Sequence, residues 1–525
     1  MRAKLRFAPI HLSFLSVLKF LLGSTALLGL LEGLPQLVSA QHVVDETESL
    51  DWAPPAIRHA QDMKVYKDPD TGSDAPPDVI RTLEIAEDPS GRVATYQPGD
   101  STVTSGNAFF QSLGTNGRSC FTCHRPENGW TVSAASVKQR FAASSGSDPI
   151  FRLVDGATCP TDKVKTIGDK RRAYKLLIDK GLIRIGLAMP ANAQFEVTKV
   201  DDPYSCTTNP ATGLTSKTSG IVSVYRRPLP STNLGFLTAI MWDGREPSLA
   251  NQSIDATLGH AQAEQPPTSS QQEQIVEFET GIFTAQIFDN KAHDLHADGA
   301  NGGPLPLPGQ LAEFFVGIND PVGLNPTGAP FDPNVFDLYT SPMWQGLQDP
   351  EGDHQGIAAD RRSIARGERV FNTTAINITG VTGLNDALQM PSIAGFCGTC
   401  HDNPDAGNHS VKAPLNIGVA NAGANSPPSL DISGLPVFTL KCTKGPMAGQ
   451  TFTVTDPGRA LISGNCADIG KVKGPILRGL ASRAPYFHNG SAATLLDVVN
   501  FYDQRFGIGF TDQDKQDLVN FLNAL

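Results

Sequence analysis

The chain has 525 residues, which is enough for two or three domains that each bury a core of their own. Its formal net charge of −11 at neutral pH disfavours binding to nucleic acid, because both partners would be anionic. Gly and Pro are plentiful, at 50 and 39 residues, so the sequence predicts long loops and excludes a helical bundle with short turns.

The N-terminus reads as a secretory signal peptide over residues 1–40. Basic residues open it, an apolar run follows from Phe20 to Leu31, and the small residues of Val38–Ala40 stand at a cleavage position. The apolar run is too short to span a bilayer as a membrane anchor would. We therefore expect cleavage after Ala40, a periplasmic location and no membrane span in the mature chain. Residues 41–95 are polar and rich in Pro, which predicts an extended N-terminal arm.

Two runs of the form Cys-x-x-Cys-His carry the strongest chemical information. They are Cys120-Phe-Thr-Cys123-His124 and Cys397-Gly-Thr-Cys400-His401. In each run two thiols one turn apart can add to the vinyl groups of a haem, and the adjacent histidine can bind its iron. A zinc site would need a second ligand pair close in sequence, and neither run has one. The sequence thus predicts two covalently attached haems of the c type.

Four further cysteines remain after the two haem runs. Cys159 and Cys206 follow the first run, and Cys442 and Cys466 follow the second. In an exported chain, proximity favours the pairs Cys159–Cys206 and Cys442–Cys466, each closing a loop rich in Gly and Pro. Four cysteines allow three connectivities, so the other two stay open.

Helical patterns surround both haem runs. A short helix is predicted at 105–113 before the first run, and another at 363–371 before the second. The chain ends on a pattern with Thr511 as N-cap, acidic residues in the first turn, and one apolar face formed by Leu518, Phe521, Leu522 and Leu525. A helix before the haem and another at the end of the domain is the arrangement of a cytochrome c.

The expected fold is therefore mainly α, with two cytochrome c-like haem domains and long loops. We place the N-terminal haem domain at 96–350 and the C-terminal haem domain at 351–525, with a linker near 348–353. The first domain is enlarged by 131–235 and 265–345, whose composition predicts insertions with short strands. The sequence assigns these insertions no function.

Four segments carry a resemblance to a known family. They are Asn116–His124, the Trp-Asp-Gly-Arg segment Met241–Gln252, the second haem run, and Ala484–Tyr502 with its Pro-Tyr-Phe-His-Asn-Gly-Ser motif. In these segments the chain resembles the bacterial dihaem cytochrome c peroxidase superfamily, which includes the MauG-type enzymes. The resemblance implies that the N-terminal haem reacts with peroxide and that the C-terminal haem relays electrons.

The resemblance also implies residues around the first haem. Trp242 is the candidate bridge between the two irons, although aromatic residues are more often packed in a core. Gln252 matches a glutamine of the family, but Gln262 stands where the family has a distal glutamate, and an amide cannot move a proton. We therefore expect Glu264 to be the acid/base group, with His260 beside it. His260 could instead bind the iron or be an ordinary loop histidine.

The second haem needs a sixth iron ligand. MauG-type members have a tyrosine at the end of a Val-Val-x-Phe-Tyr run, which implies Tyr502 here, and an anionic phenolate would stabilise oxidised iron. Met447 is the alternative ligand, and Tyr502 could also be a packed aromatic. Arg245, Arg478 and Arg483 are candidate partners for the haem propionates, or they could form surface ion pairs. The resemblance further allows a calcium ion between the domains, near Pro485.

These residues together predict an oxidoreductase that reduces hydrogen peroxide at the N-terminal haem. A small cytochrome c or a cupredoxin would supply the electrons. One alternative is a MauG-like oxidation of a protein or organic substrate, another is a non-catalytic dihaem electron carrier, and a third is an oxygenase that cleaves an apolar substrate. A carrier would need no proton-transfer group beside the iron, so this group separates the carrier from the enzymes.

Overall fold

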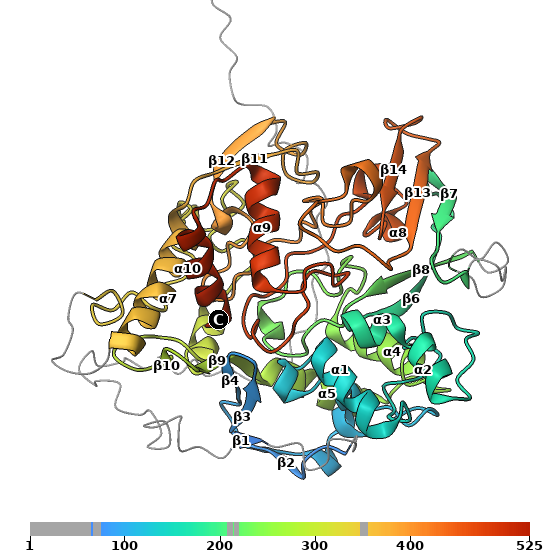
Figure 1. Ribbon diagram of the computed structural model, residues 1–525, viewed down its shortest axis with the longest axis horizontal. Coiled ribbons are helices and arrows are strands. Elements are labelled where there is room, and N and C mark those ends of the chain that lie inside the picture. Colours follow the sequence, from blue (N-terminus) through green and yellow to red (C-terminus); the bar gives the residue numbers. More distant parts are fainter. Residues whose placement is uncertain (1–64, 67–74, 207–213, 215–219, 347–354) are drawn as a thin grey trace, which may run out of the picture. The chain divides into compact units, whose positions relative to one another are not determined.

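The computed structural model describes residues 65–66, 75–206, 214, 220–346 and 355–525. Figure 1 shows helices and small sheets joined by long loops, as the Gly and Pro content predicts. The predicted signal peptide, most of the predicted arm and the domain boundary near 348–353 lie outside the described residues. The division into two haem domains therefore stays a prediction.

Ten α-helices lie within the described residues, and several begin at a capping side chain. The hydroxyls of Ser133, Ser248, Thr268, Thr494 and Thr511 each accept a hydrogen bond from a backbone amide of the first turn. The helices are α1 (Ala134–Ser144), α2 (Ile167–Ala173), α3 (Lys175–Lys180), α4 (Leu249–Gly259), α5 (Ser269–Gly281), α6 (Leu307–Glu313), α7 (Gln355–Thr373), α8 (Ala460–Ser463), α9 (Leu495–Phe506) and α10 (Asp512–Asn523).

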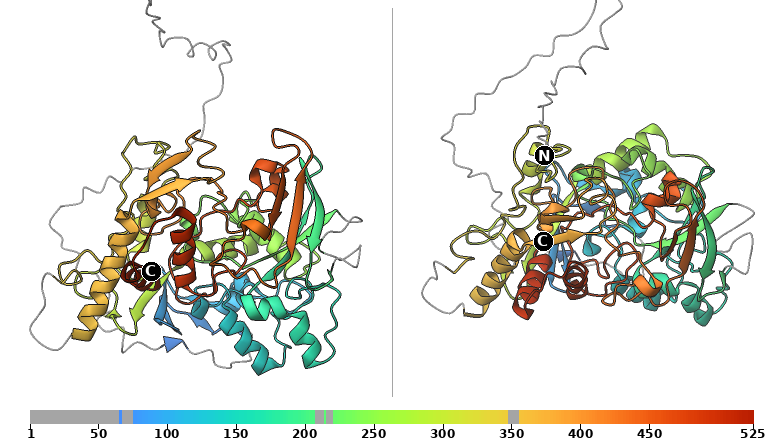
Figure 2. Two further views of the ribbon diagram at one scale, coloured as in Figure 1. Left: turned by 45° about the horizontal axis from the view of Figure 1, so that its top comes forward. Right: turned by 90° about the horizontal axis from the view of Figure 1, so that it is seen from above.

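The helices predicted at 363–371 and at the C-terminus are confirmed as α7 and α10, which lie side by side in Figures 1 and 2. The predicted apolar face of α10 is buried. The two backbones meet at Gly367, where a Cβ atom would lie 2.0 Å from the carbonyl oxygen of Asp517. Only glycine allows this approach, and the core around it includes Phe336, Tyr339 and Trp344.

The strands of the described residues form small sheets. The largest contains β1 (Val65–Tyr66), β3 (Leu83–Asp88), β4 (Gly91–Tyr96), β9 (Phe283–Asp289) and β10 (His293–Asp294), in that order. Two-stranded sheets pair β2 (Val79–Ile80) with β5 (Thr102–Val103), β6 (Ile183–Ala188) with β8 (Ile221–Arg226), and β11 (Ile376–Thr379) with β12 (Ser392–Gly395).

The structure differs from two local expectations in the first hundred residues. The hairpin of β3 and β4 falls at the end of the segment predicted to be an extended arm, because Ile85, Val93 and Ala94 are buried where β4 pairs with β9. The helix predicted at 105–113 is replaced by two 3-10 turns, Thr104–Gly106 and Ala108–Phe110. Asn107 separates them in an extended conformation and accepts a hydrogen bond from the Phe109 amide at 2.9 Å.

A three-stranded sheet joins distant parts of the chain. Strand β7 (Phe195–Asp201), from the predicted insertion at 131–235, pairs with β13 (Val437–Cys442), which pairs in turn with β14 (Thr451–Val454). The three strands lie together at one edge of the molecule in Figure 1. Both predicted disulfides, Cys159–Cys206 and Cys442–Cys466, are confirmed, and all four cysteines belong to the core beneath this sheet.

The described part of the chain holds no helix that is both long enough and apolar enough to cross a lipid bilayer.

Candidate active site and cofactor pockets

The two Cys-x-x-Cys-His runs adopt the same local structure. The first cysteine of each run begins a 3-10 turn, Cys120–Thr122 in the first run and Cys397–Thr399 in the second. A threonine hydroxyl closes each turn by accepting the backbone amide that precedes it, at 3.1 Å from Ser119 to Thr122 and at 2.9 Å from Phe396 to Thr399. None of the four cysteines of the runs forms a disulfide within the described residues. Each turn therefore presents two thiols and one histidine on a single short segment, as covalent haem attachment requires.

Each histidine ring is oriented by a hydrogen bond at Nδ1, the nitrogen that would face away from a metal. Nδ1 of His124 lies 2.8 Å from the Trp130 carbonyl oxygen, and Nδ1 of His401 lies 2.6 Å from that of Gly407. A carbonyl can only accept, so Nδ1 carries the proton and Nε2 keeps its lone pair for iron. Burial lowers the pKa of His124 to about 4 and also lowers the pKa of His401. Both rings are therefore neutral, which is the form that binds a metal.

Each haem run opens into a large pocket. The first pocket, which includes Cys120, Cys123 and His124, holds about 1300 Å³ of space free of protein atoms. The second pocket, at Cys397, Cys400 and His401, holds about 1680 Å³. These volumes include space open to solvent, so the lining residues carry the argument: each pocket brings two thiols and a histidine of one run to the same wall, as a covalently attached porphyrin would need.

The second pocket contains buried cations that lack an anionic partner. Arg227, Lys473 and Arg483 line it, and no carboxylate pairs with any of them in the described chain. Arg227 donates only to carbonyl oxygens, among them Arg483 at 2.8 Å. Burial lowers the pKa of Arg227 to about 9, of Lys473 to about 7 and of Arg483 to about 10. Two haem propionates would supply the missing negative charge, so these residues fit the predicted cofactor.

Arg483 is one of three arginines predicted to bind propionates, and the other two, Arg245 and Arg478, have different partners. Arg245 lines the first pocket, but it is paired with Asp243 at 3.0 Å and with Glu246 at 3.6 Å. Arg478 is buried, donates to the Gly303 carbonyl at 2.8 Å and is not among the residues that line either pocket. The buried cations of the second pocket that have no carboxylate partner in the described chain are therefore Arg227, Lys473 and Arg483.

Helix α4 forms one wall of the first pocket. Gln252, Ala256 and His260 are four residues apart and so share one face of the helix, which lines the pocket. Nδ1 of His260 lies 2.6 Å from Asp155 Oδ2, and Arg118 Nη1 donates to the other oxygen of Asp155 at 2.6 Å. Burial would raise the pKa of Asp155, but Arg118 and the bond from His260 outweigh it and hold that pKa below its usual value.

Glu264, the predicted acid/base group, is exposed and is not among the residues that line the first pocket. Gln262 explains this placement, because it takes a left-handed conformation with φ of 55° two residues before Glu264. Thr115 and Asn116 hold that turn, with Thr115 Oγ1 donating to the Gln262 carbonyl at 2.9 Å. The chain therefore leaves the pocket after Ala261, and His260, the C-cap of α4, keeps its ionisable side chain in the pocket.

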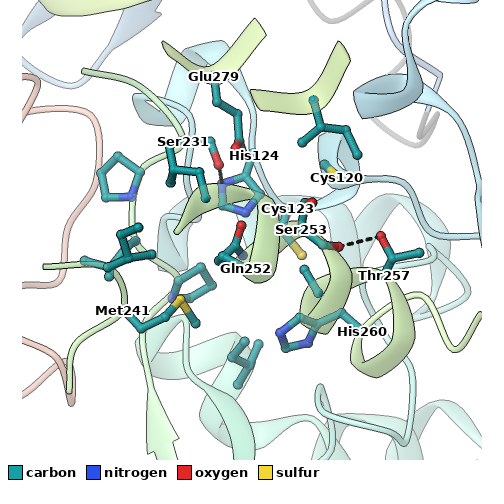
Figure 3. Close-up of a pocket in the computed structure, with 18 of the residues that line it drawn as sticks. Cys120, Cys123, His124, Ser231, Met241, Gln252, Ser253, Thr257, His260 and Glu279 are labelled. Atoms are coloured by element: carbon teal, nitrogen blue, oxygen red, sulfur yellow. Dashed lines mark hydrogen bonds between the residues drawn. The ribbon is translucent and has the colours of Figure 1, made fainter. Parts of the chain in front are cut away.

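Two polar residues that the sequence did not single out lie on the other side of His124. Figure 3 shows Ser231 and Glu279 on one side of the His124 ring, with Gln252 and His260 on the opposite side. Ser231 Oγ is 3.0 Å from Nδ1 of His124. Burial raises the pKa of Glu279 to about 7, although a hydrogen bond from Ser231 partly offsets that rise. A glutamate between the apolar residues Phe278 and Ile282 was the only indication in the sequence.

Trp242 lines both pockets, as do Arg227 and the segment 228–230. Its indole Nε1 donates to the Arg227 carbonyl at 2.8 Å, which fixes the orientation of the ring. The backbone carbonyl of Trp242 accepts a bond from Lys473 at 2.8 Å, so this residue is held from both sides. The residue therefore lies in the wall that the two pockets share, and its role as a bridge stays a prediction.

The two candidate ligands for the second iron lie in different places. Tyr502, on α9, lines the second pocket, and burial raises the pKa of its phenol. Met447 lies between β13 and β14 and packs against the core beneath that sheet. The described residues that line the second pocket include no methionine. The described chain also holds no group of three or more His, Cys, Asp or Glu side chains placed to hold a metal ion, so the predicted calcium ion, which relies on backbone oxygens, stays untested.

No protein-family model matches the chain. The chain is 36% identical over 150 residues to a cytochrome-c peroxidase, IdrP2, of Denitromonas iodatirespirans, a match that covers 27% of this chain and 38% of that protein. It is 32% identical over 194 residues to the cytochrome-c peroxidase IdrP2 of Pseudomonas sp. (strain SCT), covering 31% of this chain and 50% of that protein.

A solved structure of a MauG-like protein associated with microbial copper homeostasis aligns with 60% of this chain and 79% of its own, at 15% identity and a TM-score of 0.30. In the two sequence comparisons, the matched segments span at most half the length of the curated relatives. The sequence matches confirm the predicted resemblance: over about a third of its length, the chain is similar to bacterial cytochrome c peroxidases.

Proposed function

We propose that the chain is a periplasmic dihaem c-type oxidoreductase that reduces hydrogen peroxide in the first pocket. The observation that carries this proposal is the pairing of His260 with Asp155 in the pocket that contains His124. A carrier of electrons has no use for a proton-transfer group over its iron, whereas O–O cleavage requires one. When bound, each haem would supply the redox-active iron.

His260 performs the proton transfer in this proposal. Its Nδ1 is committed to Asp155, so Nε2 is the free nitrogen that can take a proton from one peroxide oxygen and return it to the other. Asp155 stays ionised because of Arg118, and it therefore stabilises the protonated imidazole that forms midway. The Gln252 amide, on the same helix face, can hold the substrate by hydrogen bonding. Two electrons and two protons enter, and two waters leave.

The electrons come from the second pocket by way of Trp242. The indole lies in the wall shared by both pockets, and an aromatic ring there shortens each electron-transfer step. A small cytochrome c or a cupredoxin is the proposed donor to the haem at His401. The acidic charge of the chain suits a donor with a basic surface, since electrostatic attraction speeds encounter.

A second candidate function rests on Tyr502. This tyrosine lines the second pocket while Met447 does not, which favours an oxygen ligand and oxidised iron at that site. Under this alternative, a MauG-like oxidation of a protein or organic substrate would replace electron delivery from a donor. Electron paramagnetic resonance of Tyr502→Phe separates the alternatives: loss of the low-spin signal of the second haem favours the tyrosine ligand, and an unchanged signal removes it.

Peroxide turnover by the purified full-length protein tests the main proposal. Haem content is measured first, and His260→Ala is then compared with Glu264→Gln under a common electron donor. His260→Ala should lower kcat/KM by roughly 10²–10⁴-fold, because a positioned proton-transfer group contributes about that much. Glu264→Gln should leave it unchanged, since Glu264 lies outside the pocket.

The opposite pattern would return the acid/base role to Glu264 and refute the role of His260. A third outcome is that His260 is an iron ligand, and cyanide binding distinguishes this outcome from an acid/base role of His260 or Glu264. In that case the oxidised protein should bind cyanide only weakly, and His260→Ala should bind it faster than the unmodified protein.

A further inference from the structure

A buried hydroxyl and a buried carboxylate extend the hydrogen bonding of His124 on the side away from α4 (Figure 3). Nδ1 of His124 faces two acceptors, the Trp130 carbonyl at 2.8 Å and Ser231 Oγ at 3.0 Å. The Ser231 hydroxyl also lies beside the carboxylate of Glu279, whose raised pKa it partly offsets. The imidazole, the hydroxyl and the carboxylate therefore follow one another on this side of the ring.

His401 has no such extension. Its Nδ1 donates to the Gly407 carbonyl at 2.6 Å, and no side chain of the described residues hydrogen-bonds its ring. The two histidines therefore share the same motif and the same backbone contact. They differ in the side chains behind the ring, which makes the second site an internal reference for the first.

Glu279 lies in an unfavourable place for a carboxylate. Its residue is 4% exposed, and its Oε2 atom has no hydrogen-bond partner in the described chain. It packs on α5 beside the aromatic core that contains Phe109, Trp130 and Phe278. Such a group costs stability without a compensating ion pair, so its presence beside Ser231 points to a role in the site.

Ser231 and Glu279 should change the electron density on the His124 ring in one direction. A hydroxyl that donates to a carboxylate becomes a stronger acceptor, because hydrogen bonds in sequence polarise one another. A stronger acceptor draws the Nδ1 proton outward and raises the electron density on Nε2. More electron donation from the axial nitrogen stabilises the oxidised iron relative to the reduced iron.

We propose that Ser231 and Glu279 are positioning residues that lower the reduction potential of the haem at His124 below the value that the Trp130 carbonyl alone would set. The inference rests on the proposed haem attachment at His124, but it does not depend on peroxide being the substrate. The reacting atoms never touch either residue; both act through the imidazole.

The test is the midpoint potential of each haem in the full-length dihaem protein, with Ser231→Ala and Glu279→Gln. We expect the first haem to become easier to reduce in both variants, with the ratio of reduced to oxidised iron rising about tenfold at fixed applied potential, equivalent to about 59 mV for one electron. The second haem should not shift. Resonance Raman of the reduced protein should show a weaker iron–histidine bond at the first haem only.

Two further variants sharpen the result. Ser231→Thr keeps the hydroxyl and should restore the original potential. Ser253→Ala removes a hydroxyl that lines the same pocket but donates to the Ala250 carbonyl at 2.8 Å, and it should leave the potential of the first haem unshifted. If Glu279→Gln fails to incorporate haem, Ser231→Ala still removes the link between His124 and Glu279.

Haem content by mass spectrometry is measured before the potentials. A protein without haem at Cys120 and Cys123 would overturn the proposed function and this inference with it. A loaded protein whose first-haem potential is the same in Ser231→Ala and Glu279→Gln as in the unmodified chain would overturn the inference alone. Equal shifts at both haems would do the same, because they would indicate a general change of fold.

Discussion

Arg226 holds two buried carboxylates from distant parts of the chain, and its removal should be costly. Its Nε and Nη2 donate to Asp456 at 2.7 and 3.0 Å, and its Nη1 donates to Asp243 at 2.5 Å. Without Arg226, Asp243 would keep Arg245 at 3.0 Å, whereas Asp456 would keep no arginine. Breaking one buried ion pair costs about 3–5 kcal/mol, so Arg226→Met should lower the free energy of unfolding by about that amount.

The stability lost in Arg226→Met should also be larger at neutral pH than in mild acid. Burial would raise the pKa of Asp243 and Asp456, but Arg226 outweighs burial and holds both pKa values below their usual range. In the unmodified protein this stabilisation is therefore complete above about pH 4 and is lost only as the pH falls through the lowered values. In Arg226→Met, burial would raise the pKa of Asp456, which would then bind a proton in mild acid.

Urea unfolding followed by far-UV circular dichroism at pH 7 and pH 5 measures both effects. We expect the stability difference between Arg226→Met and the unmodified protein to be largest at pH 7 and to narrow at pH 5. Arg172→Met is the matched control, because it removes a pair with Asp169 in which the arginine side chain is 75% exposed, and it should cost about 0.5 kcal/mol or less. A loss below about 1 kcal/mol for Arg226→Met, or a difference that ignores pH, would refute the reasoning.

Three further changes test how the fold holds the pockets in place. Gly367→Ala should destabilise the protein by about 1–3 kcal/mol in thermal unfolding, because its Cβ would lie 2.0 Å from the Asp517 carbonyl oxygen. Gly356→Ala on the same helix is the control, since its Cβ would meet no atom within 4 Å, and it should be neutral or stabilising. Replacing Cys442 and Cys466 with Ser opens a loop of 24 residues and should lower the free energy of unfolding by about 3 kcal/mol, with no loss if the disulfide is already open in solution. Thr494→Ala removes the N-cap of α9, the helix that carries Tyr502, and should cost about 1 kcal/mol by urea unfolding, while Thr494→Ser should cost much less.

The proposed reaction and the proposed tuning act on opposite sides of His124. His260 and Asp155 lie on the side where a substrate would bind, and Ser231 and Glu279 lie behind the axial ligand. Variants on the two sides of His124 should therefore change different measured quantities. His260→Ala should change turnover without moving the potential of the first haem, and Ser231→Ala should move the potential.

Features that depend on neighbouring residues could be predicted from the sequence alone. Two thiols and a histidine within five residues form the pattern of covalent haem attachment, and this pattern is recognised without knowledge of tertiary structure. The C-terminal helix could be predicted with its N-cap Thr511 because caps and apolar periodicity are local. The disulfides followed from the short loops that they close, since short loops bring their ends together at low entropic cost.

The groups that surround each Cys-x-x-Cys-His run depend on the tertiary structure. His260 meets Asp155 across 105 residues of sequence, and no local pattern indicated that pair. Counting along the chain led to Gln262, and Glu264 was preferred because an amide cannot move a proton, but Glu264 follows the left-handed turn at Gln262 and is exposed. The physical reason is the same in both cases: the side chains that line a pocket come from elements far apart in sequence, and packing between those elements sets their positions.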